Sequence, residues 1–129
     1  MYLWRVTANQ YQTDDLSLRI EVVESTQNIK MIFYGKSKAR SPEDFLNAII
    51  LEVINKARPE QKDIILDFYN LEFINSATVA PIIKLWAKLK SAGIRLIIEY
   101  NGNLKWQKTS FMAFSVFEKE SELFKLHAR

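Results

Sequence analysis

Short apolar runs separated by helical patterns are the feature that most constrains the fold of this chain. Residues 63 to 69, Asp-Ile-Ile-Leu-Asp-Phe-Tyr, are nearly continuously apolar, which is typical of a strand covered on both faces. Residues 94 to 100 indicate another strand, and residues 29 to 34 a further one that ends at Gly35. Residues 16 to 22 alternate strictly between apolar and polar, which predicts a half-buried strand.

Helical patterns fill the intervals between these strands. The segment Ser41-Pro42-Glu43-Asp44 predicts a helix start, with Ser41 as the N-cap and Asp44 as the acid of a capping box. An apolar stripe at helical spacing follows and ends at Arg58-Pro59. A second helix is expected over 78–91 and a third over 104–117, and the tail from Glu120 is expected to add a short fourth one.

This order of elements predicts one α/β domain over residues 1–129, with a mixed sheet of about four to five strands and three to four helices. The strand–helix units of the second half are expected to be right-handed parallel crossovers. Residues 2 to 6 are a further candidate strand, with residues 10 to 15 as the turn that follows. An apolar edge strand at 2–6 would also be able to pair with a second copy and form a homodimer.

Composition narrows the function classes. The 129 residues include no cysteine and a single histidine, His127, which is expected to lie in an unordered tail. Thiolate metal sites are therefore excluded, and no nucleophile–base pair indicates an enzyme. No metal or other cofactor is expected, since Asp63 and Asp67 lack a histidine or glycine-rich loop beside them. The net charge of +3, with cations scattered among fifteen acids, does not favour nucleic-acid binding.

Location is also an expectation from the sequence. No apolar run approaches the roughly 20 residues that span a bilayer, and the first residues do not resemble a secretory signal. A cytoplasmic protein without membrane contact is therefore expected.

The loops that leave the three parallel strands are expected to share one end of the sheet. They comprise residues 35 to 41, 70 to 78 and 101 to 105. Open α/β folds place their binding sites at this end, where the carboxyl ends of the strands meet. The working surface is therefore expected at these loops, with the exposed side of the second helix beside them.

The middle loop contains Asn75-Ser76-Ala77-Thr78 just before the second helix. One interpretation is structural, because Ser76 or Thr78 can cap a helix by accepting from a free backbone N–H. The other is functional, because a helix N-terminus stabilises a bound anion or a phosphoryl group. Other residues expected in this partner- or anion-binding surface are Gly35, Lys36, Lys38, Arg40, Asn101 and Lys105.

The segment Leu66-Asp67-Phe68-Tyr69-Asn70-Leu71-Glu72-Phe73-Ile74-Asn75-Ser76 resembles the signature of the STAS family, the anti-sigma factor antagonist-like domains. In that family a strand of the type LDLSxVxFIDSSG leads into a helix whose start carries a regulatory serine. The resemblance continues through the second helix into Lys90-Ser91-Ala92-Gly93-Ile94-Arg95-Leu96-Ile97-Ile98. It is clearest over residues 29–100.

The resemblance implies a non-enzymatic bacterial switch that acts by partner exchange. Single-domain members are phosphorylated on serine by a partner, typically a histidine-kinase-like anti-sigma factor, and dephosphorylated by a cognate phosphatase. The unmodified form binds the partner and so frees a sigma factor or another target. A phosphate at the helix start would suit the helix dipole and would change the docking surface.

This sequence departs from the family signature at the switch itself. Aligned without a gap, Asn75 replaces the aspartate, Ala77 replaces the usual phospho-serine and Thr78 replaces the glycine. Either Ser76 or Thr78 accepts the phosphate instead, or the chain is a constitutive docking module. The alternative from another class is a small-ligand sensor, in which the helix start and Lys36 or Lys38 hold a nucleotide or other anion.

Overall fold

The computed structural model describes residues 7–129, so the strand expected over 2–6 lies outside the described residues. The strands are β1 (Thr7–Gln12), β2 (Leu18–Glu24), β3 (Asn28–Ser37), β4 (Asp63–Asp67), β5 (Leu71–Ile74), β6 (Leu96–Tyr100) and β7 (Phe124–Ala128). The helices are α1 (Glu43–Ala57), α2 (Val79–Ala92), α3 (Lys105–Met112) and α4 (Ser115–Glu120), with short 3₁₀ helices η1 (Arg58–Glu60) and η2 (Ser76–Thr78).

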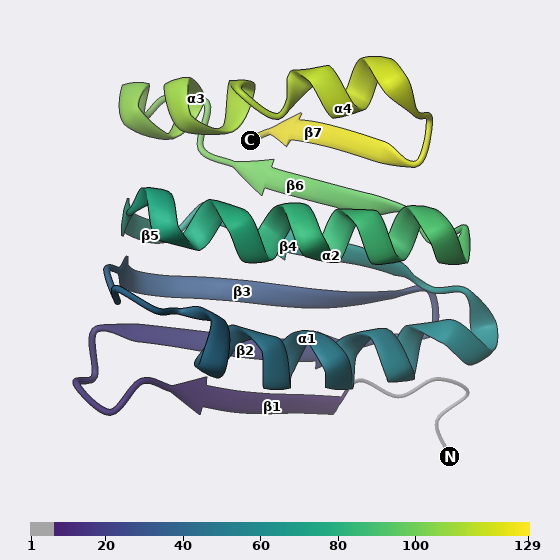
Figure 1. The fold of residues 1–129 in the computed structure, drawn as a ribbon, viewed down its shortest axis with the longest axis horizontal. Helices are drawn as coiled ribbons and strands as arrows, with labels where there is room; N and C mark the ends of the chain where they lie inside the picture. The colour runs from purple at the N-terminus through teal and green to yellow at the C-terminus, as the bar shows by residue number, and fades with distance from the viewer. Residues whose placement is uncertain (1–6) are drawn as a thin grey trace.

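The strands form one mixed sheet in the order β1-β2-β3-β4-β6-β7 (Figure 1). β1, β2 and β3 are antiparallel neighbours, whereas β3, β4, β6 and β7 run parallel. The short β5 pairs in parallel with the end of β3. The α/β class and the mixed sheet are confirmed, although residues 7–129 form seven strands where four to five were predicted for the whole chain.

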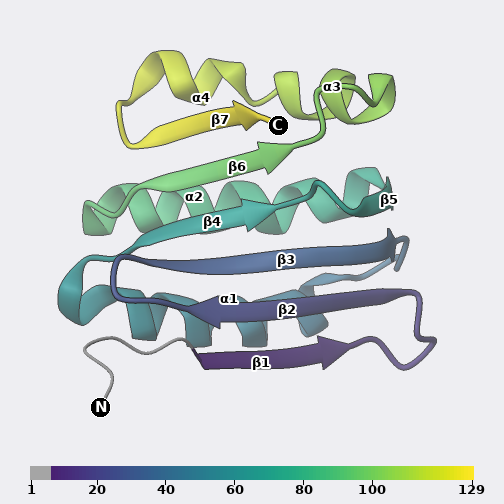
Figure 2. The ribbon, with the colours of Figure 1, turned by 180° about the vertical axis from the view of Figure 1, so that it is seen from behind.

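The sheet carries helices on one face only. Figure 1 shows α1 and α2 lying along the strands on the front face, and Figure 2 shows that no described helix covers the opposite face. The prediction that 63–69 is covered on both faces is therefore wrong: Ile64 and Leu66 are buried, whereas Ile65 is half-exposed. In the sheet register Ile65 stands beside Lys30, and lysine methylenes can shield such a side chain from water.

Two segments expected to be non-strand are strands at opposite edges of the sheet. β1 occupies much of the predicted turn over 10–15, and its Tyr11 hydroxyl donates to Glu52 of α1. β7 replaces the short helix expected from Glu120, because Phe124 and Leu126 alternate toward the core. Pairing with β6 and burial of Phe124 decide the conformation of this segment.

The helices differ from expectation in two details. The third helix is divided into α3 and α4 by a turn at Ala113 and Phe114, and the buried Phe114 packs against Phe124. α1 begins at Glu43, one residue after Pro42, which was expected at the first helical position; no side chain caps it, so the capping box with Ser41 is not formed. Ser41 is exposed and Pro42 occupies the cap position. None of the described helices is long and apolar enough to cross a bilayer.

β3 does not end at Gly35 but continues to Ser37. Gly35 adopts φ +88°, and a register shift follows it where β3 leaves β4 and pairs with β5. After this shift β5 pairs with β3 in place of β4, and η2 and α2 follow β5 along the chain. The candidate turn at 75–78 is therefore positioned by the bend near Gly35.

Candidate functional site

The Asn75 side chain caps η2, the 3₁₀ turn that leads directly into α2. Its Oδ1 accepts from the backbone N–H of Thr78 at 3.1 Å and from the Thr78 hydroxyl at 2.7 Å. Its Nδ2 donates to the carbonyl of Ala39 at 2.8 Å, which ties the turn to the loop after β3. Thr78 holds the predicted N-cap position of α2, but the prediction that Thr78 or Ser76 accepts from a helix N–H is wrong, because Asn75 accepts instead, at the start of η2.

Thr78 is enclosed beneath this turn. It is 1% exposed, and its hydroxyl lies 2.7 Å from that of Ser37, which is 2% exposed. Because the single Thr78 hydroxyl proton is directed at Asn75, Ser37 donates to Thr78. In this chain of three polar side chains Ser37 and Thr78 are buried, which disfavours Thr78 as a phosphate acceptor, since a kinase must reach the oxygen.

Ser76 is the exposed hydroxyl of the turn, and Ala77 beside it is half-buried. Ser76 borders a hollow of about 190 Å³ between the start of α2 and the segment α3–α4. The hollow is lined by Ile74, Asn75, Ser76, Val79, Ser110, Phe111 and Phe114. A phosphate on Ser76 would lie at the positive end of α2 and at the mouth of this mainly apolar hollow.

Two of the lysines that were expected beside the turn border a different part of the surface. Lys36 and Lys38 are exposed and line a different hollow of about 230 Å³, between the β1–β2 hairpin and the start of α1. Asp14 and Asp15 line the same hollow, and hydrogen bonds from Ser17 hold the pKa of Asp15 at about 2. An ionised carboxylate beside the lysines makes this hollow a poor anion site. Arg40 is exposed on the same loop.

The loop after β6 contributes a structural connection. The Asn101 side chain accepts from the N–H of Asn103 at 2.9 Å, so it stabilises its own turn, and Lys105 is exposed at the start of α3. The important residue here is Gln107, which sequence reasoning missed. It is fully buried, donates to the carbonyls of Phe68 at 2.7 Å and Leu71 at 3.0 Å, and accepts from Asn101 N–H at 2.7 Å.

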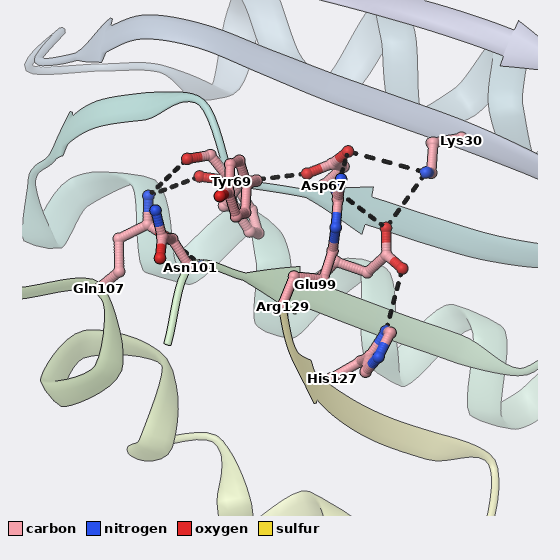
Figure 3. Close-up of polar contacts among 9 residues, drawn as sticks. Lys30, Asp67, Tyr69, Glu99, Asn101, Gln107, His127 and Arg129 are labelled. Atoms are coloured by element: carbon pink, nitrogen blue, oxygen red, sulfur yellow. Dashed lines mark hydrogen bonds and ion pairs between the residues drawn. The ribbon is translucent and has the colours of Figure 1, made fainter. Parts of the chain in front are cut away.

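A cluster of charged side chains on the open face of the sheet was also missed (Figure 3). The Lys30 ammonium nitrogen lies 3.2 Å from a carboxylate oxygen of Glu99 and 3.8 Å from one of Asp67. A guanidinium nitrogen of Arg129 lies 3.1 Å from the same oxygen of Asp67. His127 is 3.1 Å from Glu99, so β7 positions the histidine that was expected in an unordered tail. Arg129 also lies over the ring of Tyr69. Within residues 7–129 no group of three or more His, Asp or Glu could hold a metal ion.

The charges around Glu99 determine how its carboxylate responds to acid. Burial raises the pKa of Glu99, but hydrogen bonds from His127 and Lys30 and the charge of Arg129 outweigh burial and lower it overall. The lowered pKa stabilises the folded state above about pH 4.5, the ordinary value of a glutamate, and this contribution is lost as the pH falls through the folded-state pKa.

Replacing Glu99 by glutamine should therefore remove part of the acid sensitivity of the fold. The variant should be less stable than the wild type at neutral pH, by no more than about 1 kcal/mol for a partly exposed ion pair. Urea unfolding at several pH values should show this difference shrinking as the pH falls below about 4.5. Glu122→Gln, at an exposed position, is the control. A difference that persists undiminished in acid would contradict the assignment.

Neither a protein-family model nor a curated protein matches this sequence.

Proposed function

We propose that this chain is a non-enzymatic, cytoplasmic regulatory module that binds a partner protein through the surface around Asn75–Thr78. The observation that carries the proposal is the contrast within one turn: Ser76 is exposed, whereas Asn75 and Thr78 are committed to internal hydrogen bonds. A turn that is held by internal hydrogen bonds and presents an exposed serine hydroxyl at a helix start is suited to regulation by phosphorylation.

The resemblance to the STAS signature supports the same proposal. On that basis the partner is a histidine-kinase-like anti-sigma factor that phosphorylates Ser76, and a phosphatase reverses the reaction. A phosphoserine adds a charge of about −2 at the positive end of α2, where it is stabilised by the helix dipole. The same charge alters the surface that the partner contacts, so modification and partner binding exclude each other.

Peptide-level mass spectrometry of the protein from its own cells should find phosphate on Ser76 and none on Thr78, within residues 63–84. The Thr78 hydroxyl is enclosed and its proton is directed at Asn75, so the kinase reaches only Ser76. Ser76→Ala should abolish the phosphopeptide. Absence of phosphate across growth and stress conditions would contradict the switch and leave a constitutive docking module.

Partner binding provides the second readout of the same proposal. Ser76→Asp should weaken capture of the cognate partner at least roughly tenfold relative to Ser76→Ala, which corresponds to about 1.4 kcal/mol. Thr26→Asp, exposed in the turn between β2 and β3, introduces the same charge at the opposite end of the sheet and is the control. Equal capture of all three variants would exclude the turn from the interface.

A further inference from the structure

The outward surfaces of α1 and α2 form a strip with an apolar centre. The two helices run side by side along the strands, on the same face of the sheet (Figure 1). Leu51 of α1 is 57% exposed and Ile83 of α2 is 40% exposed, although both lie on helix surfaces that face water. Between the helices lies a groove of about 480 Å³, lined by Leu51, Ile54, Asn55, Arg58, Ala87, Lys88 and Ser91.

The charge around this groove has one predominant sign. Among the exposed residues of α1 and α2, Asp44 is the one acid, whereas α2 presents Lys84, Lys88 and Lys90. Arg58 adds a further cation to the groove itself. Glu52 faces away from the groove, since it binds Tyr11 of β1 and pairs with Lys56 at 3.2 Å. An apolar centre with a cationic rim therefore faces solvent.

We propose that the α1–α2 groove binds an amphipathic helix of a partner protein whose polar side is acidic. Helix-in-groove recognition uses apolar side chains spaced at i, i+3, i+4 and i+7, and the exposed Leu51, Ile83 and Ala87 offer a matching apolar surface. Carboxylates flanking those anchors are placed to meet Lys84, Lys88 and Arg58. The 14 residues of α2 extend about 21 Å, so a partner helix of similar length fits beside it.

The groove lies beside the C-terminal halves of α1 and α2, and a ligand helix longer than the groove extends from it along α2 toward Ser76; this step rests on the proposed function. The exposed Ile83 and Ala80 continue the surface of α2 from Ala87 toward Ser76, so one end of the bound helix approaches Ser76. A phosphate on Ser76 adds negative charge beside that end of the bound helix and repels an acidic ligand. The modified form would then release the partner without any change of fold.

The test uses a displayed library of helical peptides of about 16 residues, selected on the full chain. Enriched peptides should carry helically spaced apolar residues with Asp or Glu on the flanks, and bind with Kd values below about 100 µM. Leu51→Ser and the double variant Lys84→Glu/Lys88→Glu should each weaken them at least roughly tenfold. The matched control is Lys119→Glu/Lys125→Glu, which changes two exposed lysines of α4 and β7.

The inference is overturned if no specific peptide is recovered, if the enriched peptides are not acidic, or if the α2 double variant binds within about twofold of the wild type. Each variant is first checked by thermal unfolding, so that loss of binding is not loss of fold. The selection requires neither the kinase nor the native partner. It can therefore fail while Ser76 is found phosphorylated, and it can succeed when Ser76 is never modified.

Discussion

Replacing Gln107 by leucine should lower the free energy of unfolding by about 3 kcal/mol or more. Leucine is similar in size but provides neither a donor nor an acceptor. The carbonyls of Phe68 and Leu71 and the N–H of Asn101 would lose the partner that the buried carboxamide supplies. Each buried polar group left unpaired costs about 1–3 kcal/mol. Urea or guanidinium unfolding measures the difference.

Two further variants separate this explanation from a general intolerance of substitution. Gln12→Leu makes the same chemical change at an exposed position and should alter stability by no more than about 0.5 kcal/mol. Gln107→Glu places a carboxylate against two carbonyl oxygens, so it should be more harmful at neutral pH than in mild acid, where the protonated side chain can donate. A Gln107→Leu protein as stable as the wild type would refute the role of the carboxamide.

The role of Gln107 could not be predicted from the sequence because its partners are distant along the chain. It lies 39 residues from Phe68 and 36 from Leu71, and glutamine in a helical segment is ordinarily a solvent-facing residue. The bond to Asn101 also fixes the start of α3, which lines the hollow beside Ser76. Gln107 therefore helps to position one wall of the hollow beside Ser76, although it does not line the hollow itself.

The parts of the fold that sequence reasoning predicted depend on local patterns. The stripe that ends with Ile54 and the alternation from Leu18 to Val22 repeat at the periods of a helix and a strand, so α1 and β2 were predicted close to their bounds. β7 was missed because Phe124-Lys125-Leu126 is too short for its period to be distinctive. Its conformation follows from pairing with β6, a contact between distant segments.

The four residues of the candidate turn also combine a feature that a local pattern predicts with one that depends on distant segments. Its position before α2 was predicted, because polar residues between a strand and a helix are a local signal. Which of them is the cap was not, since Asn75, Ser76 and Thr78 are all able to accept from a helix N–H. In the structure the Thr78 hydroxyl is hydrogen-bonded to Ser37 of β3, a contact between distant segments that no local pattern indicates. The cluster around Glu99 was hidden for the same reason, because β3, β4, β6 and β7 each contribute to it.

Replacing Gly35 by alanine should also lower the free energy of unfolding by about 3 kcal/mol. The sequence had placed Gly35 in a binding surface, whereas its role here is structural. Its φ of +88° lies in the left-handed region, which costs an alanine about 1–2 kcal/mol. A Cβ on Gly35 would in addition overlap the carbonyl oxygen of Ser17, a backbone atom that also accepts from Lys36 N–H at 2.7 Å. Overpacking of this kind adds about 1–3 kcal/mol. Chemical denaturation gives the total.

Gly93→Ala separates the two contributions. Gly93 ends α2 with φ +73°, and the nearest atom to an added Cβ is Gln61 Nε2 at 4.0 Å, so this variant carries the left-handed cost without a clash. The difference between the two variants therefore isolates the close approach of Gly35 to the β1–β2 hairpin. If they are equally destabilised, the approach is not tight and β3 can bend without glycine. If Gly35→Ala is the more harmful, the bend that carries β5 to the Ser76 turn requires a residue with no side chain.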